Sequence, residues 1–357
     1  MFVIASLRGF VRERSSFQAF VRENQTARQG GSVQAPGLNL TCNRLSGFRS
    51  HRNLSLESYL RAVRNSPIKS RIATVRKLFP YLFGKIERSV PEICEFDSLK
   101  NYEMNYQRLA QLLGGCERVP PPGEIEFLRS IQNRGAHPGT IGLREFLFLT
   151  AFVSIVAPQR AIEIGTLAGF SAAVIAAALH RRHPHRKGIF VDTIDRNTHS
   201  VVDANKPVGF QIPDIIPHLP GAVRVHAPAD SSIVRELAGR DELELVFIDA
   251  DHQHPRPLLD LLRIAPHIQC GGWILLPDIT LGSKSVAAKK RFGAEWLFAE
   301  WPFGKISSAN IGAVQMPGEK TAIIPMVLRL MKLPFEMSVA SHRKIRRALY
   351  GNVAELL

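Results

Sequence analysis

The pattern of apolar and polar residues after Pro122 alternates between two periods. Short runs rich in Ile, Val and Leu recur between longer segments whose apolar residues fall at helical spacing. The short runs predict strands at "AIEI", "GIFVDTID", "VRVHA", "LELVFID" and "GWILLPDI". The longer segments predict helices over 142–157, 170–182, 231–239, 256–268 and 284–299, with another in the loop after "GIFVDTID". Strands that alternate with helices are typical of an α/β fold with a doubly wound, mostly parallel sheet, whose ligands bind beyond the carboxyl ends of the strands.

The same pattern divides the chain into four predicted parts. Residues 1–53 are rich in Arg, Gly, Ser and Asn and show little periodicity, which predicts a disordered basic arm or, alternatively, a targeting segment. Helical spacing returns in residues 54–117 and predicts an N-terminal helical addition of two or three helices. The prolines of "RVPPPGE" mark its boundary with the α/β domain over 118–318. Residues 319–357 are expected to hold the last strand and a basic C-terminal helix.

The formal net charge of +15 is concentrated at the two ends of the chain. Residues 1–53 contain eight Arg and two Glu, and residues 320–357 contain seven Lys or Arg and two Glu. A basic stripe across the centre, such as a nucleic-acid groove needs, is not implied, and no specific nucleic-acid partner is expected. The basic tail either contacts an anionic partner or lipid headgroups, or forms a helix that packs on the core.

Membrane and cysteine signals predict a protein of a reducing compartment. The longest apolar run, "FLFLTAFVSIVAP", is shorter than the roughly 20 residues that cross a bilayer. The four cysteines form no CxxC or Cys/His zinc spacing and are interpreted as reduced thiols. We therefore predict a cytoplasmic protein without a transmembrane segment, or a mitochondrial one if the Arg-rich N-terminus is a transit peptide.

Two glycines, Gly165 and Gly169, follow the first predicted strand and precede a helix. A nucleotide-like ligand has to approach the backbone closely at such a turn, and a residue without a Cβ permits this approach. The GxxxG spacing differs from the GxGxxG of dinucleotide sites, which disfavours an NAD-dependent enzyme. Glu163, two residues before the first glycine, would repel a pyrophosphate but suit a ligand with positive charge. S-adenosylmethionine, which carries a sulfonium and an ammonium group, is such a ligand.

An ordered series of motifs gives the chain a family resemblance over residues 120–318. The motifs are "EIGTLAGFSA", "FVDTID" and "LELVFIDADHQHPRPLLDLLRIAPHIQCGGWILLPDI". In this order they resemble class I S-adenosylmethionine-dependent methyltransferases, in particular the small-molecule O-methyltransferases that include catechol-type enzymes and the bacterial methyltransferase domain called family 24. The resemblance implies a seven-stranded Rossmann-like sheet, S-adenosylmethionine as cofactor, and methylation of a small molecule or glycoside. A catalytically idle fold that acts as a binding or regulatory module is the alternative, and a homodimer is an open expectation.

The resemblance also implies which residues hold the cofactor. Asp195, at the end of the second motif, would accept hydrogen bonds from the ribose hydroxyls, with Asp192 as the alternative. Asp230 and Ser231 of "APADSS" would lie against the adenine, although the same residues are typical of a helix N-cap. The other implied cofactor residues are Glu163, Gly165, Thr166, Gly169, Ser171 and Asp249.

The segment "DADHQH" after the fourth strand is the predicted reaction centre. Asp249 emerges at the carboxyl edge of the sheet, and His252 has the pKa range of a base that removes the proton from a hydroxyl. A surface histidine without a catalytic role is the alternative for His252. Asp251 and His254 complete this group of acids and bases.

Metal dependence is left open by one departure from the family pattern. Catechol-type relatives have an Asp after the fourth strand and an Asp-Asn pair after the fifth, three oxygen ligands that suit Mg²⁺. Asp249 and Asp278 match, but Ile279 stands where the Asn is expected, and Pro277 offers no ligand either. His252 could complete the site, while metal-free catalysis is the favoured alternative.

Aromatic residues beyond the fifth strand suggest an acceptor pocket. Trp296 and Trp301 either wall a flat or apolar substrate or pack their helix onto the sheet. Asn310 either points back toward the site or is a turn residue at the start of a strand.

Overall fold

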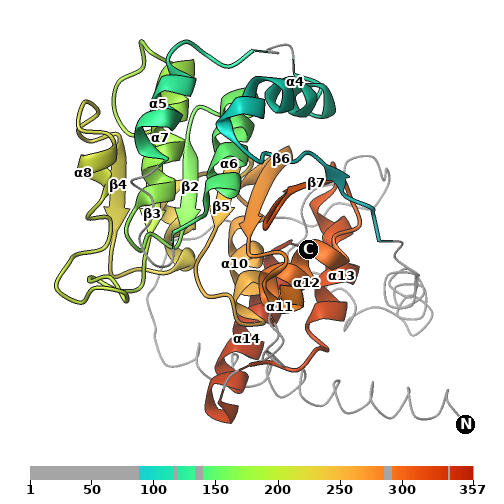
Figure 1. The fold of residues 1–357 in the computed structure, drawn as a ribbon. Helices are drawn as coiled ribbons and strands as arrows, with labels where there is room; N and C mark the ends of the chain where they lie inside the picture. Colours follow the sequence, from blue (N-terminus) through green and yellow to red (C-terminus); the bar gives the residue numbers. More distant parts are fainter. Residues whose placement is uncertain (1–87, 116–118, 133–139, 285–291, 337, 357) are drawn as a thin grey trace, which may run out of the picture. The chain divides into compact units, whose positions relative to one another are not determined.

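An eight-stranded sheet forms the centre of the computed structural model, which describes residues 88–115, 119–132, 140–284, 292–336 and 338–356 (Figure 1). The strand order is β1 (Glu92–Ile93), β7 (Lys305–Ser308), β8 (Ile311–Gln315), β6 (Ile268–Pro277), β5 (Leu243–Ile248), β2 (Ala161–Ile164), β3 (Val191–Ile194) and β4 (Val223–His226). All neighbours are parallel except β8, which is antiparallel to both β6 and β7. The predicted α/β fold with a mostly parallel sheet is confirmed. The sheet has eight strands rather than seven because β1 joins one edge.

Helices cover both faces of this sheet (Figure 1). One face is covered by α4 (Tyr102–Leu112), α5 (Glu124–Ile131), α6 (Leu143–Val156) and α7 (Phe170–Arg182). The other is covered by α10 (Arg256–Ile264), α12 (Gly293–Glu300), α13 (Ile324–Leu330) and α14 (Val339–Leu356). Alternate residues of β5 belong to the two cores, with Phe247 in the first and Val246 in the second. A strand buried on both faces has to be apolar throughout, which explains the continuous apolar runs of the sequence.

Most predicted elements form, and the differences lie at their ends. The loop after β3 holds α8 (Ile212–Ile215), and the predicted helix 231–239 is a 3-10 turn (Ser231–Ile233) followed by α9 (Val234–Leu237). The predicted helix 256–268 ends at Ile264 because Ile268 already pairs with Leu243 at the start of β6. The predicted helix 284–299 is α11 (Leu281–Lys284) and α12, between which residues 285–291 lie outside the described part.

The predicted arm or targeting segment 1–53 and residues 54–87 of the helical addition lie outside the described residues. The described remainder of that addition contains α4 but also β1, which pairs with β7. Phe96 and Tyr102 are fully buried in the same core as α6 and α7. This part of the chain therefore contributes to the central sheet as well as to its helical layer.

The predicted last strand within 319–357 is wrong. The last strand, β8, ends at Gln315, and the described elements beyond it are helical: a 3-10 turn (Lys320–Ile323), α13 and α14. Pro317 and Gly318 interrupt the strand, and Pro325 occupies the first turn of α13, where a missing N–H costs no hydrogen bond. The apolar run around Pro325 is therefore compatible with a helix and incompatible with a central strand.

The basic tail forms helix α14, which packs one face on the second core. Ile345, Leu349 and Val353 recur every four residues and are buried in the second core. The alternative of a helix packed on the core is thus the observed one. Its cations Arg343, Lys344, Arg346 and Arg347 are exposed. A search of the described helices finds none with the length and apolar content that a bilayer crossing needs.

Candidate cofactor and reaction site

A cavity of about 690 Å³ lies beyond the carboxyl ends of β2, β3 and β5. Its size is within the range of sites that hold ligands of cofactor size. Four loops form most of its wall, and they comprise residues 164–171, 194–197, 229–231 and 249–253. The cavity therefore brings together the ends of the strands that carry the sequence motifs.

The glycine loop after β2 owes its two glycines to backbone conformation and to packing. Gly165 and Gly169 have φ of +105° and +85°, which side chains disfavour. A Cβ on Gly165 would lie 2.0 Å from the carbonyl oxygen of Asp249, and one on Gly169 would lie 2.5 Å from Cγ1 of Ile212. Both glycines line the cavity, as predicted, but atoms of the protein itself already require their small size.

Glu163 lies under this loop and does not line the cavity. Its side chain is fully buried and accepts hydrogen bonds of 2.5 Å from the hydroxyls of Ser171 and Thr193. Burial raises its pKa to about 7, against the two hydrogen bonds, which lower it. The carboxyl group thus joins the first turn of α7 to β3, and the predicted direct contact with a positively charged ligand has no geometric support. Ser171 and Thr166 do line the cavity.

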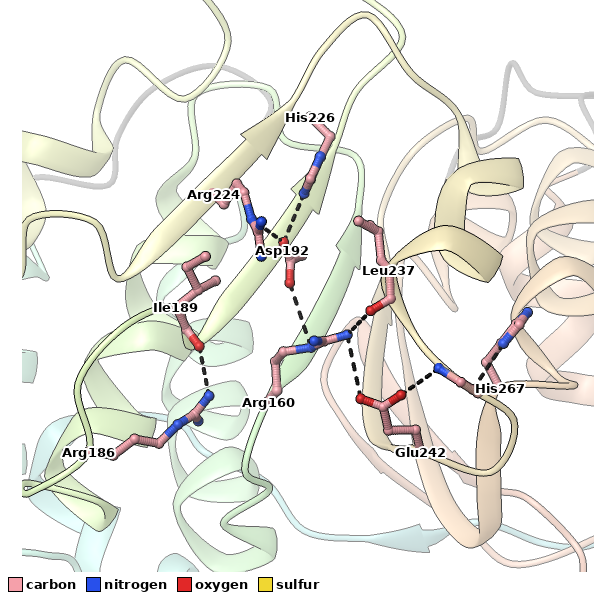
Figure 2. A network of polar contacts seen from close by, with 10 residues as sticks. Arg160, Arg186, Ile189, Asp192, Arg224, His226, Leu237, Glu242 and His267 are labelled. Carbon is pink, nitrogen blue, oxygen red and sulfur yellow. Dashed lines mark hydrogen bonds and ion pairs between the residues drawn. The ribbon is translucent and has the colours of Figure 1, made fainter.

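The two candidate ribose acids have different surroundings. Asp195 lines the cavity, and its Oδ2 accepts hydrogen bonds from the backbone N–H groups of Thr166 (3.1 Å) and Leu167 (3.0 Å). Asp192 is fully buried and is held by Arg224 Nε (2.9 Å) and His226 Nε2 (2.8 Å), as Figure 2 shows. The structure therefore leaves Asp195 as the acid that a ligand in the cavity can reach.

Figure 2 shows that Asp192 belongs to a larger polar network. Arg160 Nε lies 3.6 Å from the second carboxylate oxygen of Asp192, and the same guanidinium bonds the carbonyl of Leu237 and lies 4.0 Å from Glu242. Three cationic or titratable side chains thus surround one buried carboxylate. The network joins β3 and β4 to the segment before β2, so its role is structural.

The acids beyond β4 combine a cap with a place on the cavity wall. Asp230 caps the 3-10 turn by accepting from the N–H of Ser232 (2.9 Å), and it forms an ion pair with Arg263 (3.0 Å). Burial raises the pKa of Asp230, but the Ser232 hydrogen bonds and the Arg263 cation outweigh it and lower the pKa to about 2. Ser231 donates to Asp260 Oδ1 (2.5 Å). Asp230, Ser231 and Asp260 all line the cavity. The adenine contact that the resemblance implies for Asp230 and Ser231 stays a prediction.

The predicted reaction centre is assembled from the ends of β5 and β6. Asp249, His252 and Asp278 each offer a ligand atom within 4.8 Å of the others, and Nδ1 of His252 lies 3.3 Å from Oδ2 of Asp278. Burial, together with the nearby carboxyls of Asp278 and Glu163, raises the pKa of Asp249 well above its usual range. A histidine next to one carboxylate can accept a proton at its other nitrogen.

Asn310 points back toward the reaction centre, which was one of its two predicted positions. Its Nδ2 donates a hydrogen bond of 2.7 Å to Oδ1 of Asp278. Its Oδ1 accepts from the N–H (3.0 Å) and from the hydroxyl (2.6 Å) of Thr280. The turn between β7 and β8 therefore supports the loop after β6.

The donor set partly fits a divalent cation. Asp249, His252 and Asp278 supply two carboxylates and an imidazole, whereas Ile279 is apolar and packs in the second core. Imidazole suits zinc, iron, nickel and copper better than Mg²⁺, which prefers a shell of oxygen atoms. The three side chains therefore fit a transition metal better than magnesium.

Two predicted substrate residues and one predicted base pack against other parts of the protein and do not line the cavity. Trp301 is fully buried in the second core, and its Nε1 donates to the carbonyl of Gln315, so the predicted pocket role of Trp301 is wrong. Trp296 packs against His254 (ring centroids 5.1 Å apart) and does not line the cavity. His254 is buried, with Nε2 3.1 Å from the carbonyl of Leu330. A count of aromatic residues cannot distinguish a pocket wall from a core.

The cavity wall also contains residues that the sequence did not single out. Asp260 carried a usable signal, because an acid inside the apolar helix "RPLLDLLRI" is unusual, and burial raises its pKa. Val201, Val202 and Phe292 carried no such signal in the sequence. The additional lining side chains are those of Thr140, Ile141, Arg196, Val201, Val202, Asp260 and Phe292.

Comparisons with known proteins find a family match and several similar structures. Residues 162–279 match a family described as a methyltransferase domain, which confirms the resemblance to class I methyltransferases. Among solved structures, an O-methyltransferase from Bacillus cereus in complex with SAH is 18% identical, and the alignment covers 61% of this chain and 100% of that chain with a TM-score of 0.38. A methyltransferase from Geobacter sulfurreducens is 14% identical, with 58% and 94% covered and a TM-score of 0.36.

A third similar structure is the O-methyltransferase TomG from Streptomyces achromogenes in complex with SAM. It is 15% identical, and the alignment covers 56% of this chain and 83% of that chain with a TM-score of 0.34. A comparison with curated proteins gave no match.

Proposed function

We propose that this chain is an S-adenosylmethionine-dependent methyltransferase that methylates a hydroxyl oxygen of a small molecule or glycoside. One observation carries the proposal: a single cavity is lined by the glycine loop, Asp195 and His252, and Asp278 lies 3.3 Å from Nδ1 of that histidine. The family match over residues 162–279 supports methyl transfer as the chemistry. The acceptor oxygen follows from a histidine placed to take a proton from a hydroxyl group.

The cofactor would occupy the part of the cavity bounded by β2, β3 and β4. Asp195 already accepts two backbone N–H groups at Oδ2 and one from Asn197 (2.8 Å) at Oδ1. A carboxylate has about four acceptor sites, two on each oxygen, so Oδ1 can still accept a ribose hydroxyl. Asp230 and Ser231 would lie beside the adenine, and the loop from Gly165 to Gly169 beside the methionine part.

The acceptor would be activated by the dyad of His252 and Asp278. S-adenosylmethionine supplies a methyl group on a positively charged sulfur, which leaves as a neutral thioether. His252 would accept the acceptor's proton at Nε2, while Asp278 holds the Nδ1–H and stabilises the imidazolium that forms. The main tasks left to the protein are to align the reacting atoms and to exclude water.

A divalent ion is a second way to use the same three side chains. Asp249, His252 and Asp278 would hold it, and it would offset the two carboxylates and polarise the acceptor hydroxyl. In that case His252 would be a ligand and not the base. We favour the dyad because Ile279 supplies no oxygen ligand. Turnover measured with a chelator, with Mg²⁺ and with Mn²⁺ distinguishes the two.

Calorimetric titration of S-adenosylmethionine into the wild type and Asp195→Asn tests the cofactor site. The amide can still accept the loop N–H groups but loses the charge and one acceptor, so we expect affinity to fall about tenfold or more. Asp203→Asn is the matched control, because Asp203 also accepts a backbone N–H two residues on, from Asn205 (3.1 Å), without lining the cavity. No binding by the wild type would contradict the proposal.

An idle methyltransferase fold that binds the cofactor without using it is the remaining alternative. The replacement of the expected ligand by Ile279 is the observation that favours it. Transfer of labelled methyl to a panel of phenols, catechols and glycosides decides between the two. Tight binding of S-adenosylmethionine without transfer to any of them would support the binding module.

A further inference from the structure

We propose that Asn310 is a positioning residue that assigns the two oxygens of Asp278 to separate partners and thereby fixes the tautomer of His252. Asn310 lies between β7 and β8, outside the matched residues 162–279. The inference deepens the proposed function and rests on His252 as the base. It concerns how a reaction centre can work when the position after Asp278 is apolar.

Asp278 occupies a conformation that needs external support. Its φ is +62°, in the left-handed region that residues other than glycine rarely adopt. The next residue, Ile279, donates its backbone N–H to the carbonyl of Asn310 (3.2 Å). The turn that carries Asn310 thus holds the strained residue through the backbone as well as through side chains.

The orientation of the Asn310 amide is fixed by its partners. The backbone N–H of Thr280 can only donate, so the group that faces it at 3.0 Å is the amide oxygen. The amide nitrogen consequently faces Asp278, 2.7 Å from Oδ1. Because its oxygen also accepts the Thr280 hydroxyl at 2.6 Å, the amide has little capacity left to bind a cation. Asn310 therefore positions Asp278 and does not replace the missing ligand.

The contact with Asn310 leaves one oxygen of Asp278 for His252. Oδ1 is engaged by the amide, and Oδ2 lies 3.3 Å from Nδ1 of His252. A carboxylate anchored at one oxygen cannot rotate freely, so it presents a fixed acceptor to the imidazole. A neutral imidazole next to such an acceptor carries its proton on Nδ1 and leaves Nε2 without one. Nε2 is the atom that would take the proton of the acceptor hydroxyl.

The turn that carries Asn310 is itself anchored to a distant part of the chain. Ala309 donates its N–H to Oε2 of Glu95 (3.2 Å), and Glu95 forms an ion pair with Arg144 (2.7 Å) at the start of α6. Residues beyond both ends of the matched domain therefore contribute to the geometry of its reaction centre. This explains why the motif pattern alone does not reveal the supporting amide.

Nitrogen NMR of histidine-labelled protein tests the tautomer directly. The chelator-treated protein is recorded at a pH where imidazole is neutral, and His252→Gln identifies the signals. We expect wild-type His252 to carry its proton on Nδ1, and Asn310→Ala to show an averaged mixture of tautomers. Thr280→Val, which removes the hydroxyl contact but keeps the amide contact with Asp278, should resemble the wild type. An unchanged signal in Asn310→Ala would overturn the inference.

A double-mutant cycle separates positioning from general support of the fold. We expect Asn310→Ala to lower kcat about tenfold with the affinity for S-adenosylmethionine unchanged. In an Asp278→Ala background the same change should have less than about a twofold effect, because Asn310 acts through Asp278. Equal losses in both backgrounds would contradict this. The near-isosteric Asn310→Asp, which cannot donate to Asp278, serves if the alanine variant does not fold.

The two arms judge different claims. If the wild type does not bind S-adenosylmethionine, the proposed function fails, while the NMR signals still decide whether Asn310 fixes the tautomer of His252. If binding and turnover are normal but the NMR signals of Asn310→Ala do not change, the positioning role alone is wrong.

Discussion

Two regions of the same sheet surround a carboxylate in opposite ways, the fully buried Asp192 in one and the half-buried Asp249 in the other. Toward the edge formed by β3 and β4, Asp192 is surrounded by Arg160, Arg224 and His226. At the carboxyl ends of β5 and β6, the groups that shift the pKa of Asp249, apart from burial itself, are the carboxyls of Asp278 and Glu163. Charge is matched in the first region and left unmatched in the second.

The difference has a direct energetic meaning. A buried charge without a partner is costly, and proteins usually remove the cost with cations or hydrogen bonds. Where the cost persists, as at Asp249, it marks a site at which a ligand, a proton or a cation is expected. The network around Asp192 therefore stabilises the fold, whereas the group around Asp249 keeps a charge repulsion that a bound ligand, proton or cation would relieve.

The largest expected contrast comes from the same substitution in the two regions. Asp192→Asn removes the charge that three surrounding side chains share, and we expect a loss of about 4 kcal/mol in the free energy of unfolding. Asp249→Asn removes repulsion from neighbouring carboxyls, so at pH 8 we expect a change of less than about 1 kcal/mol or a gain. Urea denaturation of both variants measures this. Equal losses would show that the two regions do not differ.

A pH experiment on Glu163 sharpens the comparison. Its pKa of about 7 in the folded protein lies above the ordinary glutamate value of 4.5, so the folded state binds the proton more tightly. Its contribution to stability is full below pH 4.5 and is lost as the pH rises through 7, a change of about 3 kcal/mol. Glu163→Gln should not show this loss. The free energy of unfolding of the variant, relative to that of the wild type, should therefore rise from pH 4.5 to 8. A difference that is flat with pH would exclude the raised pKa.

Lys305 shows a third way to hold a buried charge, and the smallest effect is expected there. Its ammonium group donates to the carbonyls of Phe298 (3.0 Å), Ala299 (3.2 Å) and Trp301 (3.2 Å) at the end of α12, and burial lowers its pKa. Lys305→Met should cost about 2 kcal/mol, because it removes a charged donor from all three carbonyls, although that of Phe298 still accepts the Trp301 N–H and that of Trp301 the Ser89 hydroxyl. Thermal or urea unfolding checks this, with the exposed Lys332→Met as the control that should change little. A similar loss in both variants would refute the capping role.

Much of the fold follows from local patterns, because the central strands are apolar throughout and the helices have clear spacing. Strand β1 was not predicted, since a two-residue strand has no period and depends on a partner far along the chain. The sequence left open whether Trp301 lines a substrate pocket or packs in the core. The structure shows that it is fully buried in the second core.

The candidate site was predictable where residues follow strand ends. Asp195, Asp249, His252 and Asp278 lie together because parallel strands end at one edge of the sheet. The structure was needed to choose between Asp192 and Asp195 as the ribose acid. Arg160 and Arg224 form ion pairs with Asp192, and the sequence does not show which of the two carboxylates they contact. The contact of Asn310 with Asp278 depends on tertiary packing, which no spacing encodes.

The pairing of β1 with β7 bears on how the chain folds while it is being made. Phe96 donates its N–H to the hydroxyl of Ser308, which lies 212 residues later. At about 5 to 20 residues per second, a ribosome needs on the order of 10 to 40 seconds to supply that partner. Until then Cys94 and Phe96, which are fully buried in the finished protein, have no strand to lie against. The segment around β1 therefore has no strand partner until most of the chain has been synthesised.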